Sequence, residues 1–213
     1  MRSGGCAMSV GPPPVDGHGK LKSRRLGAGT VWYRISHRRY GSALHFSTGS
    51  AARWNDPLDT YGVLYVADAP ETAFAETFGH DVSVSYPPAT DKFVTVTELT
   101  ERHLYRISTG TELQLGLLQG AGLAALNLDV RLLATVDYAL PQRWSRWVYD
   151  APAALDGIIY PSRLLPDHEN TALFDRCRGH LQEEDLGPLA QWQCSETGGD
   201  ILDILDAQGW GLV

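Results

Sequence analysis

Residues 62–79 read GVLYVADAPETAFAETFG, and this stretch decides the fold class because strand chemistry gives way to helix chemistry within a few residues. The run 62–67 is short and apolar, which is typical of a buried strand. Asp68 can then cap a helix that carries Pro70 in its first turn. Glu76 lies on the apolar side of that helix, among alanine and phenylalanine. The stretch predicts a buried strand followed directly by a helix that bears a carboxylate.

Outward from this stretch, short strands and helices alternate without a strict β-α-β rhythm. Strands are expected at 30–36, 92–98, 103–107, 156–161 and 170–174, and helices at 136–149 and 200–208. Trp144 and Trp147 fall on the apolar stripe of the first of these helices and are expected in the core. The glycine-rich piece 116–122 follows no convincing strand, and Gly120-Ala121-Gly122 within it is expected to be a loop or a helix break. The pattern predicts one mixed α+β domain.

The bulk composition limits the possible functions. The 213 residues include 25 acidic and 18 basic ones, so the net charge of −7 disfavours binding to an extended nucleic acid. No apolar run approaches the roughly 20 residues that span a bilayer, and no secretory signal is present. The three cysteines lack metal-ligand spacing, which favours reduced thiols in the cytoplasm. Residues 1–29 are expected to be a flexible N-terminal extension, and the ordered domain is expected to run from 30 to 213.

Four polar residues stand at the ends or on the apolar sides of predicted elements, namely Arg34, Arg53, Glu76 and Ser162, and Tyr65 lies within the predicted strand 62–67. Such positions commonly carry functional groups. Each also has a structural explanation. Glu76 could form a salt bridge with either arginine, Arg53 could stack on Trp54, Tyr65 could pack on a sheet, and Ser162 could cap a turn.

Basic residues cluster once, in Arg34, His37, Arg38 and Arg39. The cluster is either a solvated loop beside a strand or a binding site for a small anion.

Other catalytic signatures are missing from the sequence. No serine lies in a GxSxG elbow, and neither an HExxH motif nor a cysteine–histidine cluster offers a metal site. No P-loop occurs, and no glycine-rich segment supports a Rossmann cofactor site. We therefore expect neither a metal nor a bound cofactor.

Taken in chain order, the candidate residues and their neighbours resemble the RES domain, a family named after its Arg, Glu and Ser. The segments that carry the resemblance are Tyr33-Arg34-Ile35, Ala52-Arg53-Trp54-Asn55, Val63-Leu64-Tyr65-Val66-Ala67, Ala73-Phe74-Ala75-Glu76 and Gly157-Ile158-Ile159-Tyr160-Pro161-Ser162. They cover roughly residues 30–180. One position departs from the family pattern, because Ala52 stands where the family usually has glycine.

The resemblance implies a fold similar to ADP-ribosyltransferases such as diphtheria toxin, with a split core of short strands flanked by helices. It also implies an NAD-degrading toxin that cleaves the nicotinamide–ribose bond by phosphorolysis or hydrolysis. NAD would be the substrate and inorganic phosphate a potential co-substrate. Arg34, Glu76 and Ser162 are the expected catalytic residues, whereas Arg53 and Tyr65 are expected to bind substrate. Nothing beside Ser162 in the sequence identifies it as a nucleophile.

The resemblance further implies an antitoxin partner of the Xre helix-turn-helix type, which would carry any DNA binding. A homodimer within a heteromeric complex is compatible with this, and no contact with a membrane is expected. Two alternatives stay open: a transferase that attaches ADP-ribose to a macromolecule, and a non-catalytic module that only binds a nucleotide.

Overall fold

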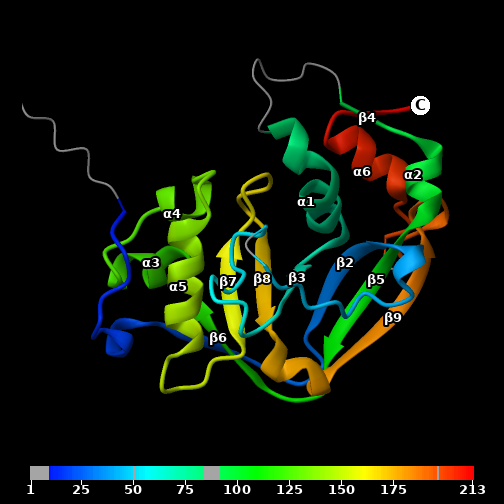
Figure 1. Cartoon of the computed structure of the whole chain (residues 1–213). Coiled ribbons are helices and arrows are strands. Elements are labelled where there is room, and N and C mark those ends of the chain that lie inside the picture. Colours follow the sequence, from blue (N-terminus) through cyan, green and yellow to red (C-terminus); the bar gives the residue numbers. More distant parts are fainter. Residues whose placement is uncertain (1–9, 50, 84–91, 196) are drawn as a thin grey trace, which may run out of the picture.

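A computed structural model describes residues 10–49, 51–83, 92–195 and 197–213 and shows one large sheet with helices grouped toward both of its ends (Figure 1). In spatial order the strands of this sheet are β1 (Ser23–Leu26), β6 (Leu113–Leu117), β7 (Gly157–Pro161), β8 (Glu169–Phe174), β3 (Val63–Ala67), β2 (Val31–His37), β5 (Arg102–Thr109) and β9 (Leu181–Pro188). Neighbouring strands run antiparallel except β6 and β7, which are parallel.

The helices fall into two groups, and a small second sheet accompanies one of them. The α-helices are α1 (Pro70–Ser83), α2 (Val96–Glu101), α3 (Gly120–Ala125), α4 (Arg131–Ala134), α5 (Ala139–Tyr149) and α6 (Ile201–Ala207). Short 3-10 turns are η1 (His18–Lys20), η2 (Arg38–Tyr40), η3 (Asp175–His180) and η4 (Leu189–Gln191). The small parallel sheet joins β4 (Lys92–Val94) to β10 (Trp210–Leu212). The predicted mixed α+β architecture is confirmed.

The large sheet opens between β2 and β3. These strands share the pair Tyr33 opposite Ala67, whereas β2 is paired with β5 along its whole length. β3 is likewise paired with β8 over five positions, from Val63 to Ala67. The two halves of the sheet therefore separate between β2 and β3, because most of the backbone hydrogen bonds that would join these strands are missing.

The parallel pair β6–β7 explains the first helix group. Parallel neighbours need a crossover connection, and α3, α4 and α5 supply it. α5 buries Trp144 and Trp147, as predicted from its apolar stripe. Gly157 is required where β7 meets β8, because a Cβ there would lie 2.4 Å from the carbonyl oxygen of Ala172. The backbones of β7 and β8 therefore lie too close at this position for any side chain.

The second helix group builds on α1. Pro70 is the first residue of α1, as expected, but Asp68 does not act as the predicted cap. Its carboxylate instead accepts bonds from the Thr72 hydroxyl and from the backbone N–H of Glu169. Asp68 consequently ties the start of α1 to the start of β8.

The predicted strand 92–98 is only half correct. β4 ends at Val94, and α2 begins at Val96 because Thr95 and Glu98 form a reciprocal capping box. Asp200 and Asp203 form a second such box at the start of α6, which confirms the helix predicted at 200–208. Side-chain caps rather than apolar periodicity set these boundaries.

The prediction of a flexible extension through residue 29 is wrong for residues 10–29, which lie against the domain. β1 pairs with β6, the Trp144 indole donates to the Gly11 carbonyl oxygen at 3.1 Å, and His18 stacks on Trp147 with ring centroids 4.2 Å apart. β1 has four residues that alternate between exposed and half-buried, so it leaves no hydrophobic signal. Residues 1–9 lie outside the described residues.

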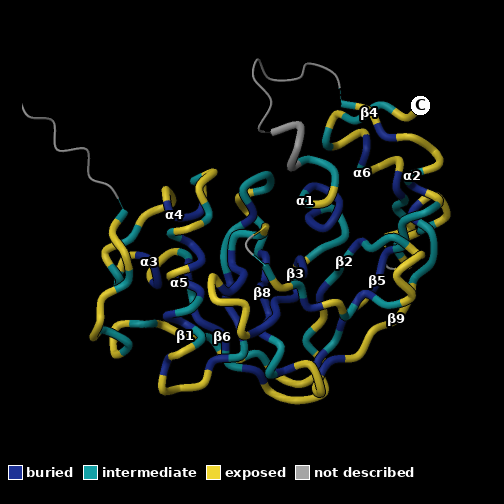
Figure 2. Tube along the Cα trace, viewed as in Figure 1, coloured by how far each residue is buried: buried dark blue, intermediate teal, exposed yellow. Residues whose placement is uncertain are grey.

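Two further strands of the large sheet, β6 and β9, were not predicted from the sequence. β6 extends into the glycine-rich piece, and Gly120 begins α3, so the loop or helix break expected at 120–122 is the start of a helix. β9 forms the other edge of the sheet, and its residues 182–185, which include three acidic residues, are exposed (Figure 2). Within the described residues, no helix is both long and apolar enough to cross a membrane.

Candidate active site

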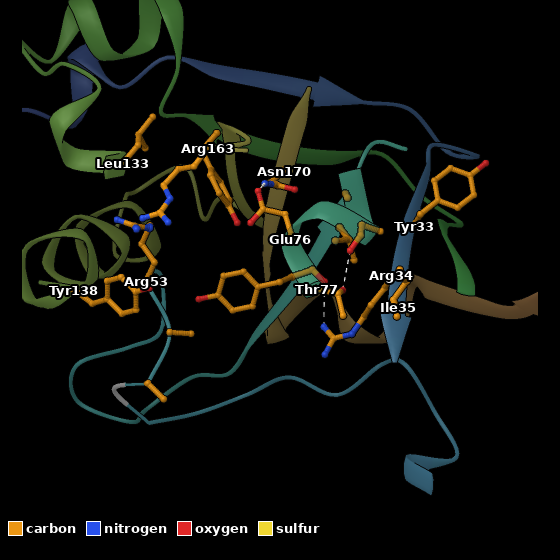
Figure 3. A pocket seen from close by; sticks show the side chains of 17 residues that line it. Tyr33, Arg34, Ile35, Arg53, Glu76, Thr77, Leu133, Tyr138, Arg163 and Asn170 are labelled. Carbon is orange, nitrogen blue, oxygen red and sulfur yellow. Dashed lines mark hydrogen bonds between the residues drawn. The ribbon is translucent and has the colours of Figure 1, made fainter. Parts of the chain in front are cut away.

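A cavity of about 420 Å³ lies where β2 and β3 part, and this volume is in the range of small-molecule sites. Figure 3 shows side chains from β2, β3, α1 and the segment around α4 and α5 pointing into it. Its walls include four of the five predicted residues, Arg34, Arg53, Tyr65 and Glu76. Residues far apart in the sequence therefore meet at the split in the sheet.

Arg34 bridges the gap between the two strands. It lies on β2, and its Nη1 donates to the backbone carbonyl oxygen of Tyr65 on β3 at 3.1 Å. A side chain thus replaces the ladder bonds that β2 and β3 lack. Burial lowers the pKa of the Arg34 guanidinium, and the negative charge of Glu183 opposes this shift. Its Nε is buried without a hydrogen-bond partner in the described part of the chain, so the group retains donor capacity beside the cavity.

Glu76 reaches the cavity from α1, and two neutral groups hold it. Its Oε1 accepts hydrogen bonds from the Ser162 hydroxyl at 2.7 Å and from the Asn170 amide at 2.7 Å. Among the described residues it forms no salt bridge with Arg34 or Arg53, so the structural ion pair considered from the sequence is absent. The carboxylate is therefore fixed in place by neutral donors rather than by an arginine.

Ser162 is nearly inaccessible and does not line the cavity. Its Oγ accepts from the backbone N–H groups of Leu164 at 3.2 Å and Leu165 at 3.1 Å while donating to Glu76. A hydroxyl has one donor and two acceptor sites, so its hydrogen-bonding capacity is used up. The turn-capping interpretation is correct, and the same hydroxyl also orients Glu76.

Tyr65 holds the loop that carries Arg53. Its phenolic oxygen donates to Asn55 Oδ1 at 2.9 Å and accepts from the backbone N–H of Trp54 at 2.9 Å. Burial raises the pKa of the Tyr65 hydroxyl well above its usual value, so it stays neutral. The ring, not the hydroxyl, is what Tyr65 offers to the cavity.

Arg53 stacks on Tyr138, with its guanidinium carbon 4.7 Å from the ring centroid, and not on Trp54 as considered from the sequence. Trp54 is fully buried instead and contacts the ring of Tyr160. Ala52 has no positive φ, so replacing the family's usual glycine causes no backbone strain. Burial lowers the pKa of Arg53, and the charge of Arg163 adds to this effect.

The basic cluster expected around Arg34 divides in the structure. Arg34 enters the cavity, whereas Arg38 and Arg39 lie exposed on η2 and His37 pairs with Glu101 at 3.2 Å. The solvated-loop interpretation therefore holds for the cluster apart from Arg34.

Several cavity residues were missed by sequence reasoning: Tyr33, Thr77, Tyr138, Tyr160, Arg163 and Asn170. Asn170 could have been noticed, because it is an amide within an apolar strand and lies opposite Tyr160 in the β7–β8 ladder. Tyr138 could not, because only the crossover between β6 and β7 brings it to this wall. In the described part of the chain, no group of three or more metal-ligating side chains gathers.

One family model matches most of the chain. Residues 31–194 match the RES domain. A curated relative, "Probable toxin y4kH" of Sinorhizobium fredii, is 31% identical over 113 residues, which is 52% of this chain and 83% of that protein. The M. tuberculosis MbcT–MbcA toxin–antitoxin complex contains a chain with a TM-score of 0.51 at 17% identity, covering 81% of this chain and 91% of that one. The last likeness bears on the fold alone.

Proposed function

This chain belongs to the RES domain family, and we propose that it is the toxin of a toxin–antitoxin system and degrades NAD by cleaving the nicotinamide–ribose bond. The observation that carries the proposal is the Glu76 carboxylate, which Ser162 and Asn170 hold at the cavity and which forms no salt bridge among the described residues. A fixed carboxylate suits a reaction in which positive charge develops on a sugar. Family membership and the toxin relative support the biological role.

The chemistry follows from charge. As the bond between the ribose C1′ and the nicotinamide nitrogen breaks, its electron pair leaves with nicotinamide and the ribose becomes oxocarbenium-like. Glu76 stabilises this charge and holds ribose hydroxyls. If water attacks C1′, the products are ADP-ribose and a proton. If phosphate attacks C1′, the product is ADP-ribose-1″-phosphate.

The remaining cavity residues bind and orient the dinucleotide. Guanidinium groups match phosphate oxygens with a planar two-donor fork, so Arg34 and Arg53 hold the diphosphate. The Tyr65 ring offers an aromatic face to the flat cationic nicotinamide. No bound cofactor is required, and phosphate enters as a co-substrate if the reaction is a phosphorolysis.

The test is mass spectrometry of NAD incubated with purified protein, in phosphate buffer and in phosphate-free buffer. We expect release of nicotinamide, with ADP-ribose-1″-phosphate indicating phosphorolysis and free ADP-ribose indicating hydrolysis. Glu76→Gln should lower the rate by about 10²-fold or more. Glu71→Gln is the matched control, because it makes the same change on α1 outside the cavity. NAD left intact by folded protein in both buffers contradicts the proposal, and labelled ADP-ribose on a macromolecule indicates a transferase instead.

An NAD-degrading enzyme must be restrained in its own cell, so we propose a cytoplasmic partner that blocks the cavity, an antitoxin of the Xre helix-turn-helix type. The assembly of the structural relative with an antitoxin supports this. Expression of the wild-type chain should deplete cellular NAD and stop growth, and co-expression of the partner should restore both. Light scattering of the purified complex measures its stoichiometry, including a homodimer of this chain within it. A purified partner that binds without slowing NAD cleavage contradicts the blocking role.

A further inference from the structure

Arg163 is a third cavity arginine that the sequence did not single out. It immediately follows Ser162, in the connection between β7 and β8, and lines the cavity together with Arg53. Figure 3 shows the nitrogen-bearing ends of Arg53 and Arg163 gathered close together beside Leu133 and Tyr138. Two segments more than a hundred residues apart in the sequence thus bring two guanidinium groups to one corner of the cavity.

Neither guanidinium has a carboxylate partner within 4.0 Å among the described residues. Other arginines of this acidic chain do, including Arg24 with Glu169, Arg131 with Asp129, and Arg146 with Asp150. Arg53 is instead anchored through the Tyr138 ring and through the carbonyl oxygen of Leu132, at 3.5 Å from Nη1. These contacts position the guanidinium group without giving it an ion-pair partner among the described residues.

Two like charges held together oppose each other. After burial, the charge of Arg163 is the next contribution that lowers the pKa of Arg53. Glu76 offsets this only in part, and its Oε1 is already bonded to Ser162 and Asn170. An anion with at least two charge-bearing oxygens, placed between the guanidiniums, would remove the repulsion and satisfy both forks.

We propose that Arg53 and Arg163 together form a binding site for a phosphate-type dianion, with Arg163 as a substrate-binding residue of the cavity. The site deepens the proposed function and rests on it. The anion is either the diphosphate of the dinucleotide or the inorganic phosphate that attacks the ribose. Both present the tetrahedral oxygens that guanidinium forks bind, and the kinetic experiment below tells them apart.

Calorimetric titration with inorganic phosphate and with pyrophosphate measures the site directly. We expect the wild type to bind at least one of these probes and Arg163→Gln to weaken that binding about tenfold or more, because a charge-assisted contact is lost. Arg163→Lys keeps the positive charge but lacks the two-donor guanidinium fork, so its affinity for the probe should lie between those of the wild type and Arg163→Gln. Arg143→Gln is the matched control, because Arg143 is an exposed residue of α5 that does not line the cavity. Equal pyrophosphate and phosphate binding by wild type and Arg163→Gln, both folded by thermal melting, overturns the site.

Steady-state release of nicotinamide identifies the source of the anion. If the site holds the NAD diphosphate, Arg163→Gln raises KM for NAD and leaves KM for phosphate unchanged. If it holds the attacking phosphate, the variant raises KM for phosphate instead. A wild type that binds pyrophosphate through Arg163 but never cleaves NAD contradicts the proposed function and leaves the site standing. NAD cleavage with neither KM altered in Arg163→Gln contradicts the site and leaves the proposed function standing.

Discussion

A single carboxylate oxygen decides how the cavity is organised. Glu76 Oε1 receives one hydroxyl and one amide donor, from Ser162 and Asn170, and both donors come from the β7–β8 hairpin. Neutral donors fix the direction of a carboxylate without cancelling its charge, which a salt bridge would do. The arrangement keeps a negative group facing a cavity whose other charged groups are arginines.

Ser162 is therefore a positioning residue in the proposed reaction, and we predict an intermediate effect on removing its hydroxyl. Ser162→Ala should lower kcat for nicotinamide release about 10- to 100-fold, because a hydrogen bond to a charged group is lost, with little change in KM for NAD. Ser162→Thr keeps a hydroxyl and should recover part of the loss, which general damage to packing would not allow. A loss in Ser162→Ala as deep as that in Glu76→Gln contradicts positioning and favours a direct chemical role.

At the scale of single residues, the sequence identified two charged residues of the cavity but did not reveal which side chains contact them. Arg34 and Glu76 stand out because charged groups are rare beside apolar elements, and both line the cavity. Asn170 gave a local signal that was not used, an amide within an apolar strand, whereas Arg163 in a loop gave none. Their significance depends on the pairing of β7 with β8, which no local pattern in the sequence reveals.

Among the elements, β1 links the N-terminal segment to the site. Arg24 on this strand forms a two-pronged contact with Glu169, the first residue of β8, and Gln119 donates to the same carboxylate. Asn170, which holds Glu76, is the next residue along β8. A strand that precedes the matched family region thus supports the strand that orients the carboxylate.

Two neighbouring arginines of β1 provide the test. Arg24→Ala should lower Tm by a few degrees and reduce the rate of NAD cleavage, because a two-pronged ion pair beside the site is lost. Arg25→Ala is the control: its contact with Glu112 is single, and both side chains are more than half exposed, so little change is expected. Equal melting temperatures and equal rates in the two variants contradict a supporting role for β1.

Elements with strong local signals were predictable, and edge elements were not. β3 and α1 combine an apolar run with a proline at the helix start, and both lie within a residue or two of their expected starts. β1 and β9 form the sheet edges, where only one neighbour is present and one face meets solvent, so their sequences carry little apolar periodicity. The boundary between β4 and α2 depends on one capping box.

For the molecule as a whole, buried ionisable groups predict a loss of stability at alkaline pH. Burial raises the pKa of the Cys177 thiol to about 12, and burial likewise raises the pKa of Tyr65 and of Tyr160. A group whose pKa is raised by folding contributes stability that is complete below its unfolded pKa, 9.0 for the thiol, and is lost as the pH rises toward the folded value.

Urea unfolding at several pH values tests this linkage. We expect the free energy of unfolding of the wild type to fall as the pH rises from 9 toward 11. The stability difference between wild type and Cys177→Ala should narrow over the same range, because only the wild type must keep this thiol neutral. A difference that is equal at pH 7 and pH 11 contradicts the raised pKa of the thiol. Iodoacetamide should label Cys177 slowly at pH 8 in the native protein, because the side chain is fully buried.

The split between β2 and β3 also dictates when the cavity can exist during synthesis. β2, which carries Arg34, is synthesised early. Glu76 is oriented only after Ser162 and Asn170 have been translated and β8 has paired with β3. The strands that close the site lie more than a hundred residues apart, and such distant pairing forms late. If the proposed function holds, a nascent chain has no NAD-cleaving activity until most of it has left the ribosome, and the proposed partner, made beforehand, can bind as soon as the cavity forms.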